Sequence, residues 1–578
     1  MTEQLTIALA QINPTVGDIA GNLAKLGALR DDAAAQGTDL IVASEMVVSG
    51  YPPDDLVLKP TFQQAVMDSV AEFAKSTAGG PAIILGAPWR DGVGHGGARG
   101  NGELRNAALF LCDGAIQAIR YKWDLPNYGV FDEKRVFQPG PLPDVIGFRG
   151  LRLGVMICED MWTPTVSAHL RGRGADILIV PNASPFEIGK VERRIGYAAA
   201  RVAETELPLI YVNQISGQDE LVFDGASFAF DGDGSLASRL PSFAESLSLL
   251  RFRHQGNWKF EKGDMAAAPE RLESIYRAMT LGLRDYVTKN RFPGVLIGLS
   301  GGIDSAISAA VAADALGPEN VRCVMMPSPY TSQDSLDDAA ACAKLLGVRL
   351  DTIPIEPAMG AFESMLAPQF AGANRDITEE NIQARIRGIT LMALSNKFGH
   401  MVLSTGNKSE MSVGYATLYG DMCGGYSVLK DVYKTTVFEL SRWRNAHRPE
   451  GAKGPRGPVM PERVITKPPT AELRPNQTDQ DSLPPYETLD AILRLMNEDD
   501  LGIADIVERG FDRATVVKVW RLLTIAEYKR RQAPPGVKIT RRAFGRERRY
   551  PITNAFNEAA LADKPAGAPT ANTIRPKL

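Results

Sequence analysis

The sequence predicts two consecutive α/β domains, and three observations support this fold class. A chain of 578 residues is too long for one hydrophobic core, so two or three domains are expected. Over residues 5–234, short apolar runs alternate with Ala-rich segments of helical spacing, which is typical of a layered α/β domain. A second alternating region begins near Arg271, and its runs VLIGLS, VRCVMMP, TIPIE and HMVLST predict the strands of a parallel sheet.

The domain boundaries follow from changes in this patterning. Weak periodicity between the two regions predicts a connecting segment. The stretch 447–461, rich in Gly, Pro and basic residues, predicts a flexible surface loop. The end of the chain, ADKPAGAPTANTIRPKL, has the composition of a weakly ordered tail. We therefore expect a first domain at 1–240, a connecting segment at 241–270, a second domain at 271–545 and a tail at 546–578.

The composition gives no reason to expect a nucleic-acid or membrane partner. The net charge is −4, which provides no general attraction to nucleic acid or anionic lipid. The start MTEQLTIALAQINP lacks the features of a signal peptide, and no run reaches the roughly 18 apolar residues that a span needs. Five scattered cysteines without a CxxC pair indicate a reducing compartment. We therefore expect a cytoplasmic protein.

The run VLIGLSGGIDS predicts a buried strand, a glycine-rich turn and the start of a helix. Gly301 and Gly302 allow backbone amides to approach a phosphate, and the helix N-terminus adds free N–H groups and a favourable dipole. Ser300 and Ser305 can donate hydroxyl groups, and Asp304 can hold a metal ion. A Walker loop is excluded, because its GxxxxGK[ST] lysine is absent.

The motif SGGIDS resembles the PP-loop of the ATP pyrophosphatases, which adenylate a substrate and release pyrophosphate. This resemblance implies a Rossmann-like parallel α/β fold of the adenine nucleotide alpha hydrolase type. It also implies ATP contacts along the loop, from Gly298, Leu299, Ser300, Gly301, Gly302, Ile303, Asp304 and Ser305.

Three segments of the first domain carry residues that belong together. Glu45 follows the run DLIVAS, Lys122 lies in IRYKWDLPNYGVFDE, and Cys158 ends the run RLGVMIC. Alone, each is ordinary: a surface acid, a surface lysine and a buried thiol. In this order and context they resemble the Glu–Lys–Cys triad of the nitrilase superfamily, which implies an αββα sandwich for the first domain.

The chemistry of amide hydrolysis fits this triad. A covalent mechanism needs a thiolate, a base that generates it and a cation that stabilises the oxyanion. Glu45 would take the proton of Cys158, and Lys122 would lower the thiol pKa and stabilise the tetrahedral intermediate. The surroundings of the five histidines do not resemble a Cys–His amidotransferase site.

Three further segments match one family: LSTGNKSEMSVGYATLYGDMCGGYSVLKDVYKT, RVITKPPTAELRPNQTDQDSLPPYETLDAIL and EYKRRQAPPG. They resemble the glutamine-dependent NAD⁺ synthetase family, and the resemblance then covers nearly the whole chain. By this similarity, glutamine would contact Tyr128, Ser184 and Lys190, ATP would also contact Thr405, and deamido-NAD⁺ would contact Asn381, Glu410 and Lys529. Asp304 and Glu410 would hold Mg²⁺, because this ion prefers carboxylate and phosphate oxygens.

The resemblance implies ATP-dependent amidation of deamido-NAD⁺ to NAD⁺ through an adenylated intermediate, with release of AMP, diphosphate and glutamate. Ammonia in water near neutral pH is mostly protonated and not nucleophilic, so we expect a sheltered tunnel between the two sites. The family tends to form large homo-oligomers, and we expect one here.

Three alternatives differ in class from this interpretation. Another PP-loop amidotransferase would resemble a Cys–His glutaminase or carry an N-terminal Cys, whereas this chain begins Met1-Thr2. An RNA-modifying PP-loop protein would favour a basic face or metal-binding cysteines, and the balanced charge opposes it. A catalytically inactive nucleotide-binding scaffold is disfavoured by the intact triad and the intact SGGIDS motif.

Overall fold

The computed structural model describes residues 4–90, 102–255, 257–475 and 477–559. The chain divides into two compact units, Met1–Glu270 and Arg271–Leu578. Each unit has its own sheets and its own hydrophobic cores.

The first unit is built on two sheets and one separate hairpin. The strands of the larger sheet are β1 (Gln4–Gln11), β2 (Leu40–Val42), β3 (Ala82–Arg90), β4 (Leu104–Cys112), β5 (Ala115–Tyr121), β14 (Ser246–Gln255) and β15 (Asn257–Phe260), in the order β15-β14-β1-β2-β3-β4-β5. The smaller sheet consists of β6 (Ile146–Phe148), β7 (Leu151–Val155), β8 (Ile177–Asn182), β9 (Leu209–Asn213), β12 (Phe228–Phe230) and β13 (Leu236–Arg239), in the order β13-β12-β9-β8-β7-β6. The hairpin pairs β10 (Ile215–Gln218) with β11 (Leu221–Asp224).

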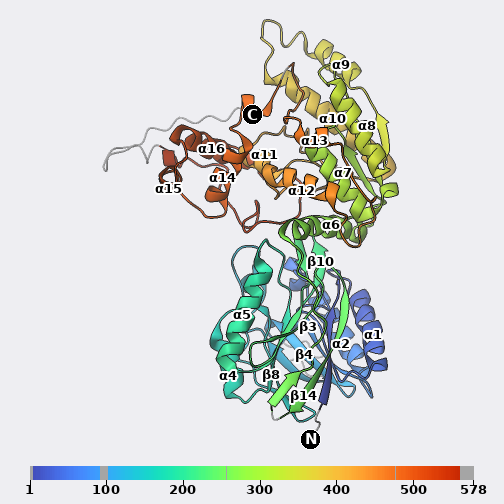
Figure 1. Cartoon of the computed structure of the whole chain (residues 1–578), viewed down its shortest axis with the longest axis vertical. Helices are drawn as coiled ribbons and strands as arrows, with labels where there is room; N and C mark the ends of the chain where they lie inside the picture. The colour runs from blue at the N-terminus through green and yellow to red at the C-terminus, as the bar shows by residue number, and fades with distance from the viewer. Residues whose placement is uncertain (1–3, 91–101, 256, 476, 560–578) are drawn as a thin grey trace, which may run out of the picture. The chain divides into compact units, whose positions relative to one another are not determined.

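The two sheets pack face to face between outer helices. Ile7 of β1 and Ile179 of β8 lie in the core between the sheets, whereas the neighbouring Ala8 and Val180 lie in cores on the outer faces, because side chains alternate along a strand. The helices and short helical turns are α1 (Ile19–Ala35), η1 (Asp54–Leu58), α2 (Pro60–Lys75), α3 (Glu133–Val136), η2 (Cys158–Met161), α4 (Pro164–Gly172) and α5 (Lys190–Thr205). Figure 1 shows α1 and α2 on one side of the sheets and α4 and α5 on the other. The αββα sandwich predicted for this unit is confirmed.

The end of the first unit differs from the connecting segment expected at 241–270. β14 lies within this range and pairs antiparallel with β1 over eight residue pairs, and β15 pairs with β14. Alternation along SLSLLRFR directs Leu250 and Phe252 into the core between the sheets. The sandwich therefore continues to Phe260, because this stretch completes the edge of the larger sheet.

The second unit contains one five-stranded parallel sheet of order β18-β17-β16-β19-β20. Its strands are β16 (Val295–Gly298), β17 (Val321–Met325), β18 (Arg349–Thr352), β19 (Met401–Ser404) and β20 (Tyr426–Ser427). The main helices beside this sheet are α6 (Arg271–Lys289), α7 (Ile303–Leu316), α8 (Gln333–Leu346), α9 (Glu356–Leu366), α10 (Ile377–Phe398), α11 (Lys408–Val413) and α12 (Lys434–Ala446).

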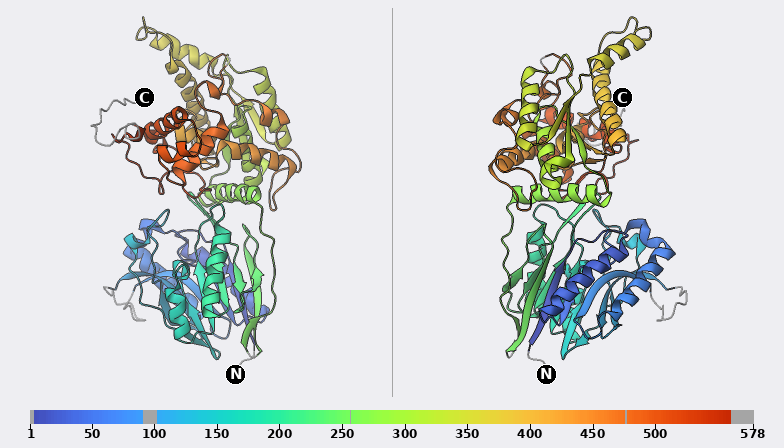
Figure 2. Two further views of the ribbon diagram at one scale, coloured as in Figure 1. Left: turned by 60° about the vertical axis from the view of Figure 1, so that its left-hand side comes forward. Right: turned by 90° about the vertical axis from the view of Figure 1, so that its right-hand side faces the viewer.

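Helices cover both faces of this sheet (Figure 2). Helix α7 packs on β16 and β17, α8 packs on β17 and β18, and α10 packs on β16 and β19. The strand order reverses between β16 and β19, and ligands in such sheets bind beyond the carboxyl ends of the strands at this point. The Rossmann-like parallel fold predicted for the second domain is confirmed.

A helical subdomain completes the second unit. Its elements are α13 (Glu462–Thr466), η4 (Asp479–Asp481), α14 (Tyr486–Asn497), α15 (Ile503–Glu508), α16 (Arg513–Ile525) and α17 (Glu527–Arg530). The short turn η3 (Pro318–Asn320) lies outside this subdomain, between α7 and β17. Leu489 and Leu493 of α14 pack with Val516 and Val519 of α16 in a separate buried cluster.

The stretch 447–461, predicted as a flexible surface loop, is anchored to the unit. Buried Arg444 donates to the carbonyl oxygens of Pro455 at 2.9 Å and His447 at 3.2 Å, and its guanidinium also pairs with buried Asp314. The side chain of Val459 is fully buried. The pattern failed to predict this anchoring because the partners of the loop lie on other elements.

The expected tail at 546–578 begins with residues that still pack on the second unit. Arg548 is buried and donates to Glu527 at 3.0 Å. Residues 560–578 of the expected tail lie outside the described residues. Across the part of the chain that the structure describes, no helix is both long and apolar enough to cross a membrane.

Candidate active sites

The structure brings Glu45, Lys122 and Cys158 together within the first unit. Glu45 follows β2, Lys122 follows β5 and Cys158 follows β7. The ammonium of Lys122 donates to Glu45 Oε1 at 2.7 Å, and the charges of both act on the Cys158 thiol. Their side chains are buried, with exposed fractions of 1%, 1% and 4%. The predicted triad is therefore one buried cluster, and its catalytic role stays a prediction.

The backbone at Cys158 makes a sharp turn. Its φ is +47°, in the left-handed region that residues other than glycine seldom adopt. Such conformations cost free energy and recur at functional sites, where the surrounding structure holds them. Here the turn leads from β7 into η2.

A second carboxylate belongs to this cluster, although it was not among the predicted site residues. Glu133 Oε1 accepts a hydrogen bond from Lys122 Nζ at 2.8 Å and another from the Tyr51 hydroxyl at 2.8 Å. Burial alone would lower the pKa of Lys122, but the charges of Glu133 and Glu45 outweigh burial and raise that pKa well above its ordinary value. Lys122 therefore remains a cation. Sequence offered only a weak signal for Glu133, its place in the polar run FDEKR.

Further donors fix the carboxylate of Glu45. The amide of Asn106 donates to Oε1 at 2.7 Å, and the N–H of Ala183 donates to Oε2 at 2.9 Å. Both partners are fully buried. The carboxylate of Glu45 is thereby held in one orientation, which suits the predicted role as a base.

The environment of Cys158 disfavours its thiolate form. Burial raises the pKa of Cys158 well above its ordinary value, and the charge of Glu45 raises it further, while Lys122 opposes the shift. In the predicted mechanism, Glu45 would remove the thiol proton when the sulfur attacks the substrate. The thiolate would then form beside a fixed cation.

Two of the predicted glutamine contacts lie beside one aromatic ring. The hydroxyl of Tyr128 donates to both carboxylate oxygens of Glu159, at 2.9 and 3.0 Å. The rings of Tyr128 and Phe131 meet edge to face, and Lys190 Nζ lies 5.4 Å from the Phe131 ring centroid. Glu159, next to the nucleophile, was not predicted, and its carboxylate can pair with the ammonium group of an amino acid.

The third predicted contact, Ser184, is buried and held from several sides. Its Oγ accepts from Arg194 Nε at 3.0 Å, and its N–H donates to Asn213 Oδ1 at 2.9 Å. Arg194 is itself paired with buried Asp224 at 2.7 Å. The neighbouring Ala183 N–H binds Glu45, which places Ser184 next to the triad.

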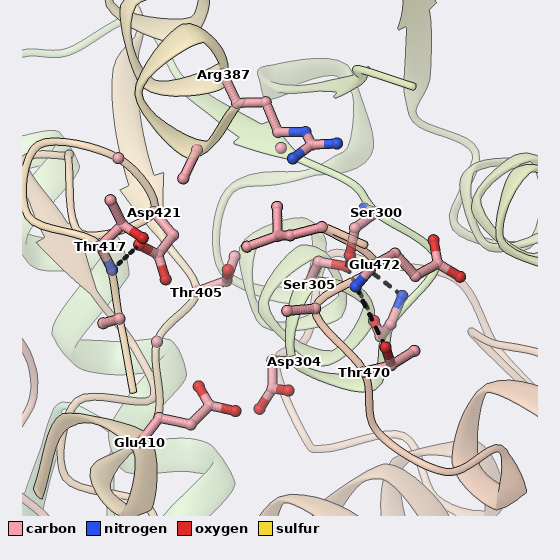
Figure 3. Close-up of a pocket in the computed structure, with 18 of the residues that line it drawn as sticks. Ser300, Asp304, Ser305, Arg387, Thr405, Glu410, Thr417, Asp421, Thr470 and Glu472 are labelled. Carbon is pink, nitrogen blue, oxygen red and sulfur yellow. Dashed lines mark hydrogen bonds between the residues drawn. The ribbon is translucent and has the colours of Figure 1, made fainter. Parts of the chain in front are cut away.

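The second unit contains a cavity of about 520 Å³. Figure 3 shows the phosphate loop on one side of it and the carboxylates of Asp304 and Glu410 facing each other. Of the predicted ATP contacts, those lining the cavity are Gly298, Leu299, Ser300, Gly302, Ile303, Asp304, Ser305 and Thr405. The three predicted deamido-NAD⁺ contacts Asn381, Glu410 and Lys529 also line it. The two predicted substrate sites therefore share one cavity.

Gly301 is the predicted loop residue that does not line this cavity. Its φ is +82°, and an added Cβ would lie 2.2 Å from the carbonyl oxygen of Ser335. The glycine therefore serves the turn itself, because it lets the loop pack closely against α8. An ATP contact through the backbone of Gly301 stays a prediction.

Hydroxyl groups brace the rest of the loop. Ser305 Oγ donates to the carbonyl oxygen of Gly302 at 2.9 Å and accepts from the N–H of Ser300 at 3.2 Å. Gly302 is the N-cap of α7 and supplies no side-chain cap, so the first-turn N–H groups of α7 are available to a phosphate.

A buried lysine joins the two carboxylates. Lys434 Nζ donates to Asp304 and, at 3.0 Å, to Glu410 Oε1. Burial raises the pKa of Glu410 to about 7, with Asp304 adding to the shift and Lys434 opposing it. Asn407 binds both acids, because it donates to Asp304 Oδ1 at 2.9 Å and accepts from the N–H of Glu410 at 3.0 Å. Neither Lys434 nor Asn407 was predicted, since Asp304, which both contact, lies 130 and 103 positions away in the sequence.

Several other cavity residues were missed. Arg387 of α10 lines the cavity, and its guanidinium points into it in Figure 3; burial lowers its pKa. Thr470 and Glu472 lie on another wall. Their segment, TKPPTAEL, was noted only as a family match, so no individual role could be assigned.

The donor set fits Mg²⁺ bound together with nucleotide phosphates. Within the described ranges no group of three or more His, Cys, Asp or Glu residues could hold a metal ion by itself. Two carboxylates, from Asp304 and Glu410, nevertheless face one cavity beside the phosphate loop. Mg²⁺ is typically held by one or two carboxylates plus substrate phosphates, so these two carboxylates fit the usual Mg²⁺ ligand set.

Comparisons with known proteins extend these observations to the whole chain. The family model of carbon-nitrogen hydrolases matches residues 6–253, and that of NAD synthases matches residues 275–533. A glutamine-dependent NAD⁺ synthetase of Rhodobacter capsulatus is 51% identical over 96% of this chain and 100% of its own length. The corresponding protein of Thermotoga maritima is 44% identical, with the same shares covered.

Solved structures agree with this result. Glutamine-dependent NAD⁺ synthetase from Acinetobacter baumannii, solved with adenosine diphosphate, is 43% identical, covers 96% of this chain and 99% of its own, and has a TM-score of 0.76. The Cytophaga hutchinsonii protein of the same name shares the fold at 20% identity, with a TM-score of 0.79 over 97% of this chain and 99% of its own.

Fold and sites together define a two-part amidotransferase, in which a nitrilase-type amidase unit accompanies a PP-loop nucleotide-binding unit. Identity, coverage and both family models then agree on one group. The chain belongs to the glutamine-dependent NAD⁺ synthetase family.

Proposed function

We propose that the chain amidates deamido-NAD⁺ to NAD⁺, with glutamine as the nitrogen donor and ATP as the activating substrate. The observation that carries this proposal is the presence of both sites in one chain of this family. One is the buried Glu45–Lys122–Cys158 cluster, and the other is the cavity beside the SGGIDS loop. Neither site alone would account for a fused amidase and nucleotide-binding protein.

In the first unit, Cys158 Sγ attacks the side-chain amide carbon of glutamine. Glu45 takes the thiol proton and returns it to the leaving nitrogen, which departs as ammonia. Lys122 stabilises the tetrahedral oxyanion, because two carboxylates keep it charged against the effect of burial. Water then attacks the thioester with Glu45 as base, and glutamate leaves. Tyr128, Glu159, Ser184 and Lys190 would orient the amino-acid end of the substrate.

In the second unit, the nicotinate carboxylate of deamido-NAD⁺ attacks the α-phosphorus of ATP. The bond to diphosphate breaks, and an acyl adenylate forms. Ammonia then attacks the acyl carbon, loses a proton and displaces AMP. The N–H groups of the loop and of α7 would hold the phosphates, while Asn381 and Lys529 would contact the dinucleotide.

Asp304 and Glu410 would hold Mg²⁺ together with ATP phosphates. When bound, the ion would neutralise charge that develops on the phosphate oxygens. Lys434 already contacts both carboxylates, so it can keep them in place and add positive charge near the triphosphate.

The experiment is a product balance. The purified chain is supplied with ATP, Mg²⁺, deamido-NAD⁺ labelled with ¹⁸O in the carboxylate, and glutamine. NAD⁺, AMP, diphosphate and glutamate are expected in equal amounts, with one ¹⁸O atom in AMP. ADP in place of AMP, or AMP without the label, would contradict the adenylate route.

A homo-oligomer is proposed as well, and exposed apolar surface on the second unit supports it. Helix α9 buries none of its residues, and Met365 and Ile389 are 61% and 67% exposed. Apolar surface of this kind often marks a protein–protein contact. Sedimentation should show a smaller species for the Met365→Glu, Ile389→Glu variant than for the wild type, and equal masses would contradict this contact.

We also propose a cytoplasmic location and sheltered transfer of ammonia. Fractionation of the native cells tests the first point. For the second, ¹⁵N-labelled ammonium added during glutamine turnover should contribute little label to NAD⁺, whereas free mixing would contradict the proposal.

A further inference from the structure

Asp160 connects two separate segments next to the triad through main-chain hydrogen bonds. Its Oδ1 accepts from the N–H of Trp123 at 3.1 Å and from that of Asp124 at 2.7 Å. Its Oδ2 accepts from the N–H of Ile157 at 2.9 Å. Three donors thus converge on one fully buried carboxylate.

The two connected segments each carry a triad residue. Trp123 and Asp124 directly follow Lys122, and Ile157 directly precedes Cys158. The main chain of Lys122 itself makes two further hydrogen bonds. Its N–H donates to the carbonyl oxygen of Asn106 at 2.9 Å, and its carbonyl oxygen accepts from the N–H of Gly140 at 2.7 Å. Asp160 is therefore the side chain that joins the C-terminal side of the lysine to the turn of the nucleophile.

The location of this carboxylate makes the connection strong. When Asp160 is ionised, its hydrogen bonds are charge-assisted and about twice as strong as neutral ones, and its side chain is fully buried. Burial raises the pKa of Asp160 to about 7, against the opposing effect of its N–H partners and of Lys122, the charged side chain that faces it. The three N–H groups would be left buried and unpaired without it, a costly state.

We propose that Asp160 is a positioning residue of the amidase, which fixes the cation Lys122 relative to the nucleophile Cys158 through their adjoining main-chain segments. This inference rests on the proposed glutaminase function of the first unit. Asp160 touches neither substrate nor reacting atoms in this account. Its effect reaches catalysis through geometry, since a displacement of about 1 Å can reduce a rate about 100-fold.

The test compares Asp160→Asn with the wild type in the full-length protein. An asparagine keeps the shape but has one acceptor oxygen, so at least one of the three N–H groups faces an NH₂ donor. We expect kcat for glutamine hydrolysis to fall at least tenfold, with the KM for glutamine changed less than twofold. NAD⁺ formation from ammonium should stay within twofold of wild type.

A matched control is Asp176→Asn. Asp176 also accepts a main-chain N–H, from Arg152 at 2.8 Å, but it lies at the start of β8, at the strand end remote from the triad. This variant should retain the wild-type kcat for glutamine.

Alkylation of Cys158 by iodoacetamide, followed at the peptide level by mass spectrometry, separates positioning from a general structural role. If Asp160 fixes Lys122 near the thiol, the midpoint of the pH profile for alkylation should move to higher pH in Asp160→Asn. Three results would overturn the proposal: an unchanged glutaminase kcat, an unmoved alkylation midpoint, or loss of both activities. Wild type and Cys158→Ala run in parallel, and glutamine hydrolysis by Cys158→Ala would instead overturn the proposed glutaminase site.

Discussion

Replacing Lys122 by Met should destabilise the first unit far more than replacing a surface lysine that makes the same kind of pair. Lys122 bonds two carboxylates, at 2.7 and 2.8 Å, and all three side chains are at most 4% exposed. Removal of one partner from a buried pair typically costs about 3–5 kcal/mol, because the remaining charges stay buried without compensation. For a unit of this size, that corresponds to a decrease of about 6–20 °C in the unfolding midpoint.

Lys75 provides the matched control. It pairs with Glu72 at 2.5 Å, but the two side chains are 69% and 74% exposed. Exposed pairs contribute about 0–1 kcal/mol, so Lys75→Met should move the midpoint by no more than a few degrees. Calorimetry of the three proteins at pH 8 gives the comparison, with the transition of the first unit identified by hydrogen exchange.

The pH dependence of the difference provides a second check. In Lys122→Met, Glu133 loses its cation, so its pKa, which burial already raises in the wild type, rises further above the unfolded value. The folded variant then binds more protons than its unfolded chain, and its stability increases as the pH falls. The pKa of Lys122 is itself raised, so its contribution in the wild type stays constant between pH 6 and 8. The difference in unfolding midpoint between Lys122→Met and the wild type should therefore be smaller at pH 6 than at pH 8. Equal effects of the two substitutions, or a gap that widens at pH 6, would refute the reasoning.

Two further predictions concern the second unit. Gly301→Ala should lower the unfolding midpoint and the ATP affinity of this unit more than Gly302→Ala does. A Cβ added at Gly301, where φ is +82°, would lie 2.2 Å from a carbonyl oxygen, whereas a Cβ added at Gly302 would lie 3.4 Å from its nearest atom. Thermal shift measures the midpoint and ATP titration the affinity, and equal losses in the two variants would contradict the packing role of Gly301. Mg²⁺ affinity in the presence of ATP should rise from pH 6 to pH 8, because the pKa of Glu410 is about 7 and a carboxylate must lose its proton to bind the ion. Calorimetric titration at several pH values tests this, and an affinity that does not change with pH would exclude Glu410 as a ligand.

The fold was predictable where periodicity and motif agree, and less so where pairing depends on distant residues. The parallel sheet of the second unit followed from strands alternating with helices. β14 was missed because its partner, β1, lies at the opposite end of the unit in sequence. The anchored stretch 447–461 was missed for a similar reason, since Arg444 and Asp314 hold it from other helices.

Site prediction shows the same division. The residues at strand ends, Glu45, Cys158 and the SGGIDS loop, stand out because function places polar groups where an apolar run stops. Side chains that support them gave no such signal. Asn407 and Lys434 contact Asp304 across 103 and 130 positions of sequence, and Glu133, only 11 positions from Lys122, follows no apolar run. Gly301 illustrates the reverse case, because its motif suggested a ligand contact while its conformation serves the turn.

The central claim is that two separable sites act in sequence, and Cys158→Ala tests it most directly. The variant is given ATP, Mg²⁺ and deamido-NAD⁺ with either glutamine or ammonium. The account predicts NAD⁺ from ammonium at a rate near that of the wild type and none from glutamine. NAD⁺ from glutamine would contradict the assignment of the nucleophile, and failure of both wild type and variant to make NAD⁺ from ammonium would contradict the proposed acceptor.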